Sequence, residues 1–498
     1  MSDVTTTDLY EVTMALSYRR EGMEAPATFS LFARALPPER GFLVSAGLEA
    51  ALDHLADFHV TPSDAADFAA VLGRPPGDLE PLAGLRFRGE VRAVPEGRVV
   101  LAGEPLLEVT APLPQAQLVE SYLLNLVNHQ TTIASKSVRS VMAARGRPVV
   151  DFSLRRTHGL EAGMQAARVG ALVGFAGTSN VAAATRWGLP AVGTMAHSYV
   201  EAFPDEEAAF RAFARTHPGP LTFLVDTYDT PLGVVAAARV LKEIRRGPGC
   251  AVRLDSGHLG ALAARARALL DEAGLPDVAV VASGGLDEYA IDELVRSGAP
   301  VDVFAVGTRV GTSADAPYLD SAYKLVEYGG APVMKLSTSK ITSPGRKQVF
   351  RSGAGAAAGV EPEAGAGTGA GGGAGAGGGA GGGAGAGAGG GGGAGAVSPP
   401  LSDLIALWDE PPPPGAEGLL RTVMRDGRRT DPPDGLADAR ARLEADLAAL
   451  PEPALRIRAP EPPAAATSPR LIALTGEVRR RIEAGIARAA DAARRERS

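Results

Sequence analysis

The feature that most constrains the fold is an alternation of strand and helix patterns that begins near residue 146. Short apolar runs, each typical of a buried strand, end in a polar or glycine-rich turn, and most are followed by a helical pattern. In chain order these turns begin at Asp151, Gly177, Gly193, Asp226, Arg253, Ser283 and Gly307. Such alternation is typical of a parallel sheet that is closed or nearly closed. We therefore expect an α/β fold built on an irregular TIM-like α/β barrel.

Changes of pattern divide the rest of the chain. Residues 1–145 mix helical and strand patterns and predict an N-terminal α+β domain, while residues 146–352 predict the barrel. Residues 353–397 are nearly pure glycine and alanine, which predicts a disordered insert because they contain no apolar side chain larger than valine to offset the entropy of ordering. Residues 398–498 regain structure, and we expect them to join the N-terminal domain and to end in a helical tail.

Composition excludes several classes of partner. The net charge of −7 gives no reason to expect nucleic acid or an anionic membrane. No apolar run is long enough to span a bilayer, and no signal-peptide pattern opens the chain. The single cysteine, Cys250, rules out an internal disulfide and fits a reducing compartment. We therefore expect a cytoplasmic protein with small-molecule partners.

The turns after the strands carry the chemistry, because the loops of such barrels converge on one face. The central one is the loop with His197, which follows the apolar run 189–192, a predicted buried strand. A histidine here can exchange a proton or carry a phosphoryl group, and the alternative is a loop histidine held by backbone groups. The turns 283–285 and 307–308 are rich in glycine, which lets backbone N–H groups approach a phosphate.

Charged side chains on the same rim extend this hypothesis. Asp226, Asp229 and Asp255 could hold a hard ion such as Mg²⁺, or could cap helices. Arg155 and Arg253 could clamp a carboxylate or phosphate. Phe152 could stack a flat ring or pack in the core. The residues alone thus leave open phosphosugar isomerases, aldolases and phosphoribosyl transfer.

The motifs, taken together, resemble nicotinate phosphoribosyltransferase, one of the type II phosphoribosyltransferases. The resemblance rests on residues 7–10, 151–156, 193–198, 253–257, 283–285, 306–308 and 336–347. It runs from about residue 5 to 351 and resumes weakly over 400–460. The Gly/Ala run and the extended C-terminal tail depart from the family pattern.

The resemblance implies an activity. The family joins nicotinate to phosphoribosyl pyrophosphate, giving nicotinate mononucleotide and pyrophosphate in NAD biosynthesis, with Mg²⁺ and with ATP as co-substrate. By this resemblance His197 is the catalytic residue that ATP transiently converts to phosphohistidine. The rivals are a nicotinamide or quinolinate phosphoribosyltransferase, a phosphosugar-binding barrel enzyme without ATP coupling, and a non-catalytic scaffold.

The resemblance also implies roles for individual residues in a homodimer that shares its active sites. Phe152 and Tyr10 of the partner subunit would sandwich the pyridine ring, with Arg253 on the nicotinate carboxylate. Asp226 and Asp255 would lie near the ribose and Mg²⁺. The remaining contacts would be to the phosphoribosyl group and its phosphates, from Arg155, Ser283, Gly284, Gly285, Gly307, Thr308, Lys340 and Lys347.

Ser179 bears on the choice between acid and amide. Nicotinamide-using relatives carry an aspartate in this loop, and a carboxylate there would repel nicotinate. A neutral serine that can donate a hydrogen bond fits the acid better.

Overall fold

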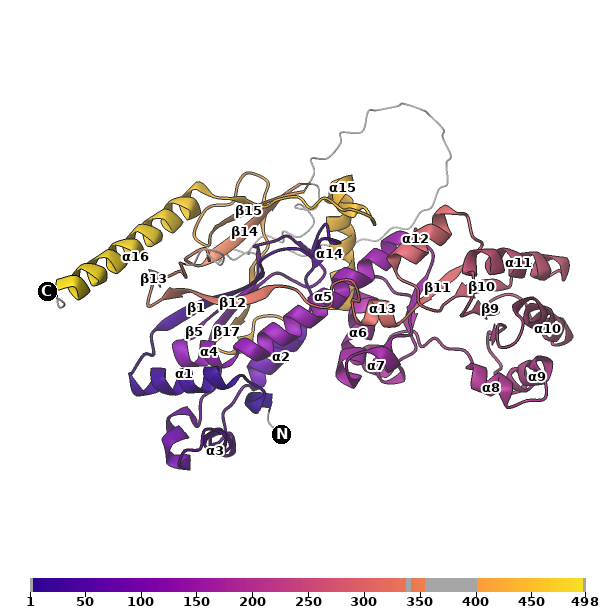
Figure 1. The fold of residues 1–498 in the computed structure, drawn as a ribbon, viewed down its shortest axis with the longest axis horizontal. Helices are drawn as coiled ribbons and strands as arrows, with labels where there is room; N and C mark the ends of the chain where they lie inside the picture. Colours follow the sequence, from indigo (N-terminus) through magenta and orange to yellow (C-terminus); the bar gives the residue numbers. More distant parts are fainter. Residues whose placement is uncertain (1–2, 337–341, 354–400, 496–498) are drawn as a thin grey trace, which may run out of the picture.

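The computed structural model describes residues 3–336, 342–353 and 401–495. The predicted Gly/Ala insert, apart from residue 353, and Lys340 lie outside the described residues. Figure 1 shows two lobes, one built on an antiparallel sheet and one on a parallel sheet, with the long helix α5 (Glu120–Ala144) running between them. None of the helices in the described ranges is long and apolar enough to cross a membrane.

The first lobe is organised by a seven-stranded sheet in the order β13-β12-β1-β5-β3-β17-β18, in which every neighbouring pair is antiparallel. It joins distant parts of the chain, since β12 pairs with β1 and β17 pairs with β3. β12 belongs to this sheet although it falls inside the segment 146–352 that was predicted for the barrel. The C-terminal limit predicted for the barrel, residue 352, is therefore too late in the chain. The strands are β1 (Pro26–Ala33), β3 (Glu90–Ala93), β5 (Pro105–Pro112), β12 (Ser321–Tyr328), β13 (Ala331–Pro332), β17 (Arg421–Arg425) and β18 (Arg428–Arg429).

A four-stranded sheet, in the order β16-β14-β15-β19, lies beside this lobe and is built mostly from the C-terminal segment. Its centre is the antiparallel pair β14 (Lys347–Ser352) and β15 (Ser402–Leu407), whose last and first residues, Ser352 and Ser402, are paired. The sheet edges are β16 (Glu417–Gly418) and β19 (Ala466–Thr467). The predicted helical tail is α16 (Pro469–Arg495), which extends away from the body in Figure 1.

The second lobe holds a six-stranded parallel sheet in the order β7-β6-β11-β10-β9-β8. It is an open half-barrel, so the expected TIM-like closure is wrong. The predicted strand 189–192 fails to extend it, since only Ala191 forms a bridge, to Thr178, and the run is not buried. The strands are β6 (Val149–Asp151), β7 (Gly177–Thr178), β8 (Thr222–Leu224), β9 (Ala251–Leu254), β10 (Ala279–Ala282) and β11 (Val303–Val306).

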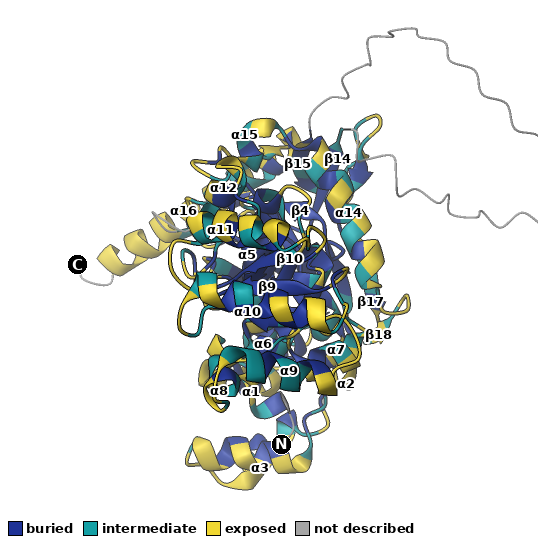
Figure 2. Cartoon of the chain, turned by 90° about the vertical axis from the view of Figure 1, so that its right-hand side faces the viewer, coloured by how far each residue is buried: buried dark blue, intermediate teal, exposed yellow. Residues whose placement is uncertain are grey.

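Helices bury the apolar strands of the half-barrel. Figure 2 shows α10 (Thr230–Glu243) and α11 (Leu259–Glu272) with exposed positions facing outward and the buried strands β9 and β10 behind them. Phe223, Val252 and Val280 have no exposed surface, and each such side chain contributes about 2 kcal/mol of burial. The other strands and helices are β2 (Leu43–Val44), β4 (Val99–Val100), α1 (Leu9–Arg20), α2 (Leu48–Asp57), α3 (Pro62–Val71), α4 (Leu113–Leu118), α6 (Leu160–Val173), α7 (Val181–Trp187), α8 (His197–Glu201), α9 (Glu206–Thr216), α12 (Glu288–Arg296), α13 (Thr308–Gly311), α14 (Leu436–Ala449) and α15 (Glu452–Leu455).

Candidate active site

A cavity of 600 Å³ opens at the carboxyl ends of the parallel strands. Its wall contains many of the residues predicted for the rim, although they are scattered in the sequence. They come from the loops after β6, β7 and β9, from β9 itself and from the first residue of α8. The predicted residues in the wall are Phe152, Arg155, Ser179, His197, Arg253 and Asp255.

Arg253 is the best-fixed side chain of the cavity. It is the third residue of β9 and only 9% exposed. Its Nε donates to Ser283 Oγ at 2.8 Å and its Nη2 donates to Asp255 Oδ1 at 2.6 Å, while Nη1 lies 3.4 Å from Thr194 Oγ1. Its guanidinium carbon lies 5.3 Å from the centroid of the Phe152 ring. A flat ring that carries a carboxylate finds both an aromatic face and a preorganised cation here.

His197 begins α8 and faces the cavity with 40% of its side chain exposed. Its Nδ1 lies 3.2 Å from Thr227 Oγ1, and its Nε2 lies 4.0 Å from Asp255 Oδ2. Burial alone would raise the pKa of Asp255, but hydrogen bonds from Ser283 and Arg253 and the charge of Arg253 hold it below its usual value. The imidazole therefore lies beside an ionised carboxylate.

The two glycine-rich turns follow adjacent strands. β10 and β11 are parallel neighbours, so the turns 283–285 and 307–308 lie at the same edge of the sheet. Gly284 has φ +87°, and a Cβ there would stand 1.8 Å from the carbonyl oxygen of Asp255. A Cβ on Gly307 would stand 3.2 Å from the carbonyl oxygen of Phe152. Glycine at 284 is thus required both by its left-handed backbone and by close packing against the β9 loop.

The predicted magnesium ligands divide into different roles. Asp229 caps α10 by accepting from Leu232 N at 2.9 Å, which was the alternative reading of this residue. Asp226 Oδ2 accepts from Asp255 N at 2.8 Å and from Ser256 Oγ at 2.7 Å, while its Oδ1 is buried without a hydrogen-bond partner in the described ranges. No group of three metal-binding side chains exists among the described residues. Among the described residues, Asp226 Oδ1 and Asp255 Oδ2 accept no hydrogen bond, so both predicted ligands keep an oxygen for a cation, the other ligands of which would come from substrate phosphates or water.

Two predicted contacts lie in the other lobe. Lys347 is 3% exposed, donates from Nζ to Gly345 O at 2.8 Å and lies 3.4 Å from Glu108 Oε1. The predicted contact of Lys347 with a phosphate is wrong, because its ammonium is buried in the first lobe beside Gly345 O and Glu108. Tyr10 lies on α1, is 44% exposed and does not line the cavity of its own chain.

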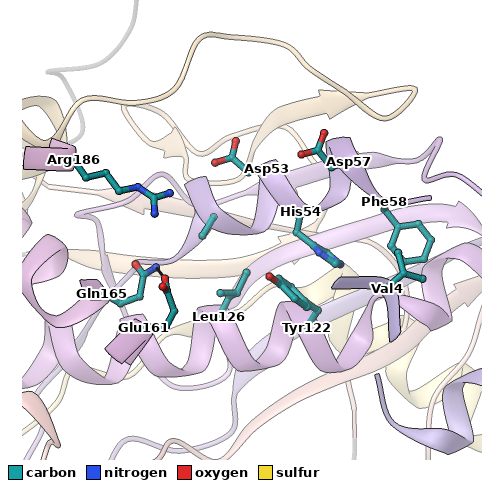
Figure 3. Close-up of a pocket in the computed structure, with 11 residues that line it drawn as sticks. Val4, Asp53, His54, Asp57, Phe58, Tyr122, Leu126, Glu161, Gln165 and Arg186 are labelled. Atoms are coloured by element: carbon teal, nitrogen blue, oxygen red, sulfur yellow. Dashed lines mark hydrogen bonds between the residues drawn. The ribbon is translucent and has the colours of Figure 1, made fainter. Parts of the chain in front are cut away.

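A second cavity of 640 Å³ lies between α2, α5 and α6 (Figure 3). Figure 3 shows Asp53 and Asp57 above it, Glu161 below and Arg186 at one end. A wall with three carboxylates and a single arginine repels a polyphosphate. The 600 Å³ cavity, with Arg155 and Arg253 in its wall, is the better site for an anionic substrate.

Sequence reasoning gave no role to Thr194 and Thr227, which contact Arg253 and His197. The one hint in the sequence of a role for these threonines is that each lies in a turn that was already predicted to carry site residues. A threonine in a turn is too common for its sequence to reveal such a contact.

The fold and the cavity together are those of a phosphoribosyltransferase. The model for the nicotinate phosphoribosyltransferase N-terminal domain matches residues 5–128, and the model for the nicotinate phosphoribosyltransferase family matches residues 148–343. The chain belongs to the nicotinate phosphoribosyltransferase family.

Individual relatives agree with this assignment. Nicotinate phosphoribosyltransferase pncB2 of Mycobacterium tuberculosis is 49% identical over 347 residues, which cover 69% of this chain and 74% of the relative. The Bacillus subtilis enzyme is 45% identical, with 69% and 72% covered. The crystal structure of human nicotinic acid phosphoribosyltransferase superposes with a TM-score of 0.76 at 29% identity, covering 95% of this chain and 99% of that one.

Proposed function

We propose that the 600 Å³ cavity is where this chain joins nicotinate to phosphoribosyl pyrophosphate, giving nicotinate mononucleotide and pyrophosphate for NAD biosynthesis. The observation that carries this proposal is the position of Arg253 over Phe152. The pyridine ring would lie on Phe152, and its carboxylate would accept hydrogen bonds from the guanidinium.

The second face of the ring needs a partner, and we assign it to Tyr10 of the partner subunit in a homodimer. Tyr10 is 44% exposed on α1 and does not line the cavity of its own chain. An exposed aromatic side chain at the start of a helix is suited to insertion into a neighbouring site.

The phosphoribosyl group would extend from the ring toward the glycine-rich turns. The backbone N–H groups of 283–285 and 307–308 would hold the 5′-phosphate, with Arg155 beside it. The pyridine nitrogen attacks the anomeric carbon as the bond to pyrophosphate breaks, and the transition state gains oxocarbenium character. Mg²⁺ bound through the free oxygen of Asp226 and the substrate phosphates would neutralise the charge of the pyrophosphate.

We propose that ATP acts by phosphorylating His197. The imidazole takes the γ-phosphoryl group, ADP leaves, and water later hydrolyses the phosphohistidine, which couples ATP hydrolysis to turnover. Thr227 fixes the orientation of the ring through Nδ1, and the carboxylate of Asp255 lies on the side of Nε2. The buried Cys250 supports a reducing compartment, and we place the protein in the cytoplasm.

The test is nicotinate mononucleotide formation with and without ATP in the wild type and in His197→Ala. We expect ATP to stimulate the wild type, to label it with acid-labile phosphate, and to do neither in the variant. Full ATP stimulation in His197→Ala would contradict the assignment. Assays with nicotinamide and quinolinate separate the rival bases, and a phosphosugar enzyme without ATP coupling would acquire no acid-labile phosphate.

A further inference from the structure

One buried lysine connects the segments that follow both glycine-rich turns. Lys136 lies on α5 and is 1% exposed. Its Nζ lies 2.6 Å from Glu288 Oε2 and 2.8 Å from Asp315 Oδ1. It does not line the 600 Å³ cavity, so it cannot contact a substrate there.

Each of the two carboxylates lies in the segment that follows one of the turns. Glu288 is the first residue of α12, which directly follows the turn 283–285. Asp315 lies in the loop after α13, the short helix that begins at Thr308. A second link joins the same segments nearer the surface, where Arg309 Nη1 lies 2.8 Å from Asp287 Oδ2. The segments that follow the two turns are therefore connected by one buried ion-pair cluster and by one pair nearer the surface.

Lys136 is not needed simply to neutralise these carboxylates. Arg139 Nε lies 2.9 Å from Glu288 Oε1, and Arg40 Nη1 lies 2.8 Å from Asp315 Oδ2. Burial alone would raise the pKa of Asp315, but hydrogen bonds and charges from Arg40 and Lys136 hold it well below its usual value. Each acid thus has an arginine of its own, and within the described ranges Lys136 is the cation that pairs with both.

A phosphate held between two turns needs a fixed separation between them. Gly284 packs against the β9 loop, but Gly285 has φ +70° and no atom within 4 Å of the place of a Cβ, so its backbone has room to move. The pairing of β10 with β11 sets the strand ends but not the loops that follow. A cation anchored on α5 supplies a buried constraint in addition to the Arg309–Asp287 pair, which is half exposed on the arginine side. Such a constraint matters because displacement of a binding group by about 1 Å can cost a large part of its effect.

We propose that Lys136 is a positioning residue that fixes the separation of the turns 283–285 and 307–308 and so sets the affinity for the 5′-phosphate of phosphoribosyl pyrophosphate. The proposal rests on the function proposed above. It concerns a side chain outside the cavity, and it predicts a defect confined to one of the two substrates.

The test is a comparison of KM values in Lys136→Met, which keeps the length of the side chain and removes the charge. We expect KM for phosphoribosyl pyrophosphate to rise about tenfold or more, as for other residues that orient a binding group, while KM for nicotinate stays within about twofold. Lys136→Arg keeps a cation between the two acids and should recover part of the loss. The matched control is Arg168→Met, which breaks the buried pair with Glu96 at 2.6 Å, away from both turns.

Two further variants keep the test decisive if Lys136→Met does not fold. Glu288→Gln and Asp315→Asn each release one turn from the ammonium while preserving shape, and each should raise KM for phosphoribosyl pyrophosphate selectively. Unchanged values, or equal increases for both substrates, would overturn the positioning role. A wild type that forms no nicotinate mononucleotide would instead overturn the proposed function, so the two failures are distinct.

Discussion

The guanidinium of Arg253 lies over the ring of Phe152, 5.3 Å from its centroid. The two residues are 101 positions apart, with Arg253 in β9 and Phe152 directly after β6, and these strands are not neighbours in the sheet. Arg253 is held by Ser283 and Asp255, so the cation is oriented before any ligand arrives. This pair gives the cavity its complementarity to a flat ring that carries a carboxylate.

Removing the ring of Phe152 should weaken binding of nicotinate. Phe152→Ala loses the stacking surface, and we expect KM for nicotinate to rise about tenfold, which corresponds to about 1.4 kcal/mol. Phe152→Tyr keeps the aromatic face and is the matched control. Steady-state kinetics with nicotinate as the varied substrate make the measurement, and an unchanged KM in Phe152→Ala would place the ring elsewhere.

A carboxylate at position 179 should lower the activity of the enzyme with nicotinate. Ser179 is exposed in the wall of the cavity, so Ser179→Asp places a negative charge where an anionic ring must enter. We expect kcat/KM for nicotinate to fall at least about tenfold and the ratio of nicotinamide to nicotinate turnover to rise. Ser179→Asn, which is neutral and similar in size, should retain nicotinate turnover. A loss of the same size in both variants would point to crowding rather than charge.

The carboxylate of Asp446 should be among the strongest single contributors to the stability of the first lobe. Its Oδ2 accepts from Arg98 Nε at 2.9 Å, Val99 N at 2.8 Å and Arg351 Nη1 at 2.7 Å, all of them buried. Asp446→Ala leaves two guanidinium groups short of a partner, and we expect the free energy of unfolding to fall by about 3–5 kcal/mol. The control, Asp438→Ala, removes an exposed carboxylate from the same helix and should change it by less than about 0.5 kcal/mol. Denaturant titration of both variants measures the difference.

Glu104 should make stability depend on pH. Burial and the neighbouring Asp403 carboxylate raise the pKa of Glu104 well above its usual value. The unfolded chain ionises this group above about pH 4.3, whereas the folded chain keeps it protonated, so its contribution to stability is lost as pH rises from there toward the folded pKa.

Glu104→Gln keeps the shape and removes the titration. We expect this variant to match the wild type at pH 4 and to become the more stable of the two at pH 7 and 8. Urea unfolding at each pH is the measurement. Stability differences that stay constant across this range would show that Glu104 is ionised in the folded protein.

Residues 354–400 should be replaceable by a short turn. Ser352 and Ser402 are already paired across β14 and β15, and Arg351 contacts Asp403 in the same hairpin at 2.6 Å. A turn of about four residues can close such a pair of strands. We expect the shortened protein to keep its unfolding midpoint and its kcat, and a loss of activity without a loss of stability would give the segment a role in catalysis.

Local patterns were enough to predict the ends of β6, β8, β10 and β11, whereas Gly177 and Arg253, which were expected to begin turns, lie within β7 and β9. Apolar runs of short length, followed by glycine or by an acid that caps a helix, are decided by neighbouring residues, as Asp287 shows by capping α12 at Ala290 N. The family motifs depend on the same local spacing, and six residues predicted for the rim line one cavity, while their roles in binding and catalysis stay predictions.

Contacts between distant segments were beyond the reach of those patterns. Whether 189–192 adds a strand, and so whether the sheet closes, depends on hydrogen-bond partners across the lobe rather than on the apolar run itself. The sequence around Lys347 resembles a phosphate-binding motif of the family. In the structure, however, Lys347 is the first residue of β14 and its ammonium lies 3.4 Å from Glu108 Oε1. The sequence by itself thus determined that polar or glycine-rich residues follow most of the apolar runs, because that is a matter of local spacing. Only the tertiary structure decided that Lys136 pairs with both Glu288 and Asp315, because an ion pair forms between groups that folding brings together from far apart in the chain.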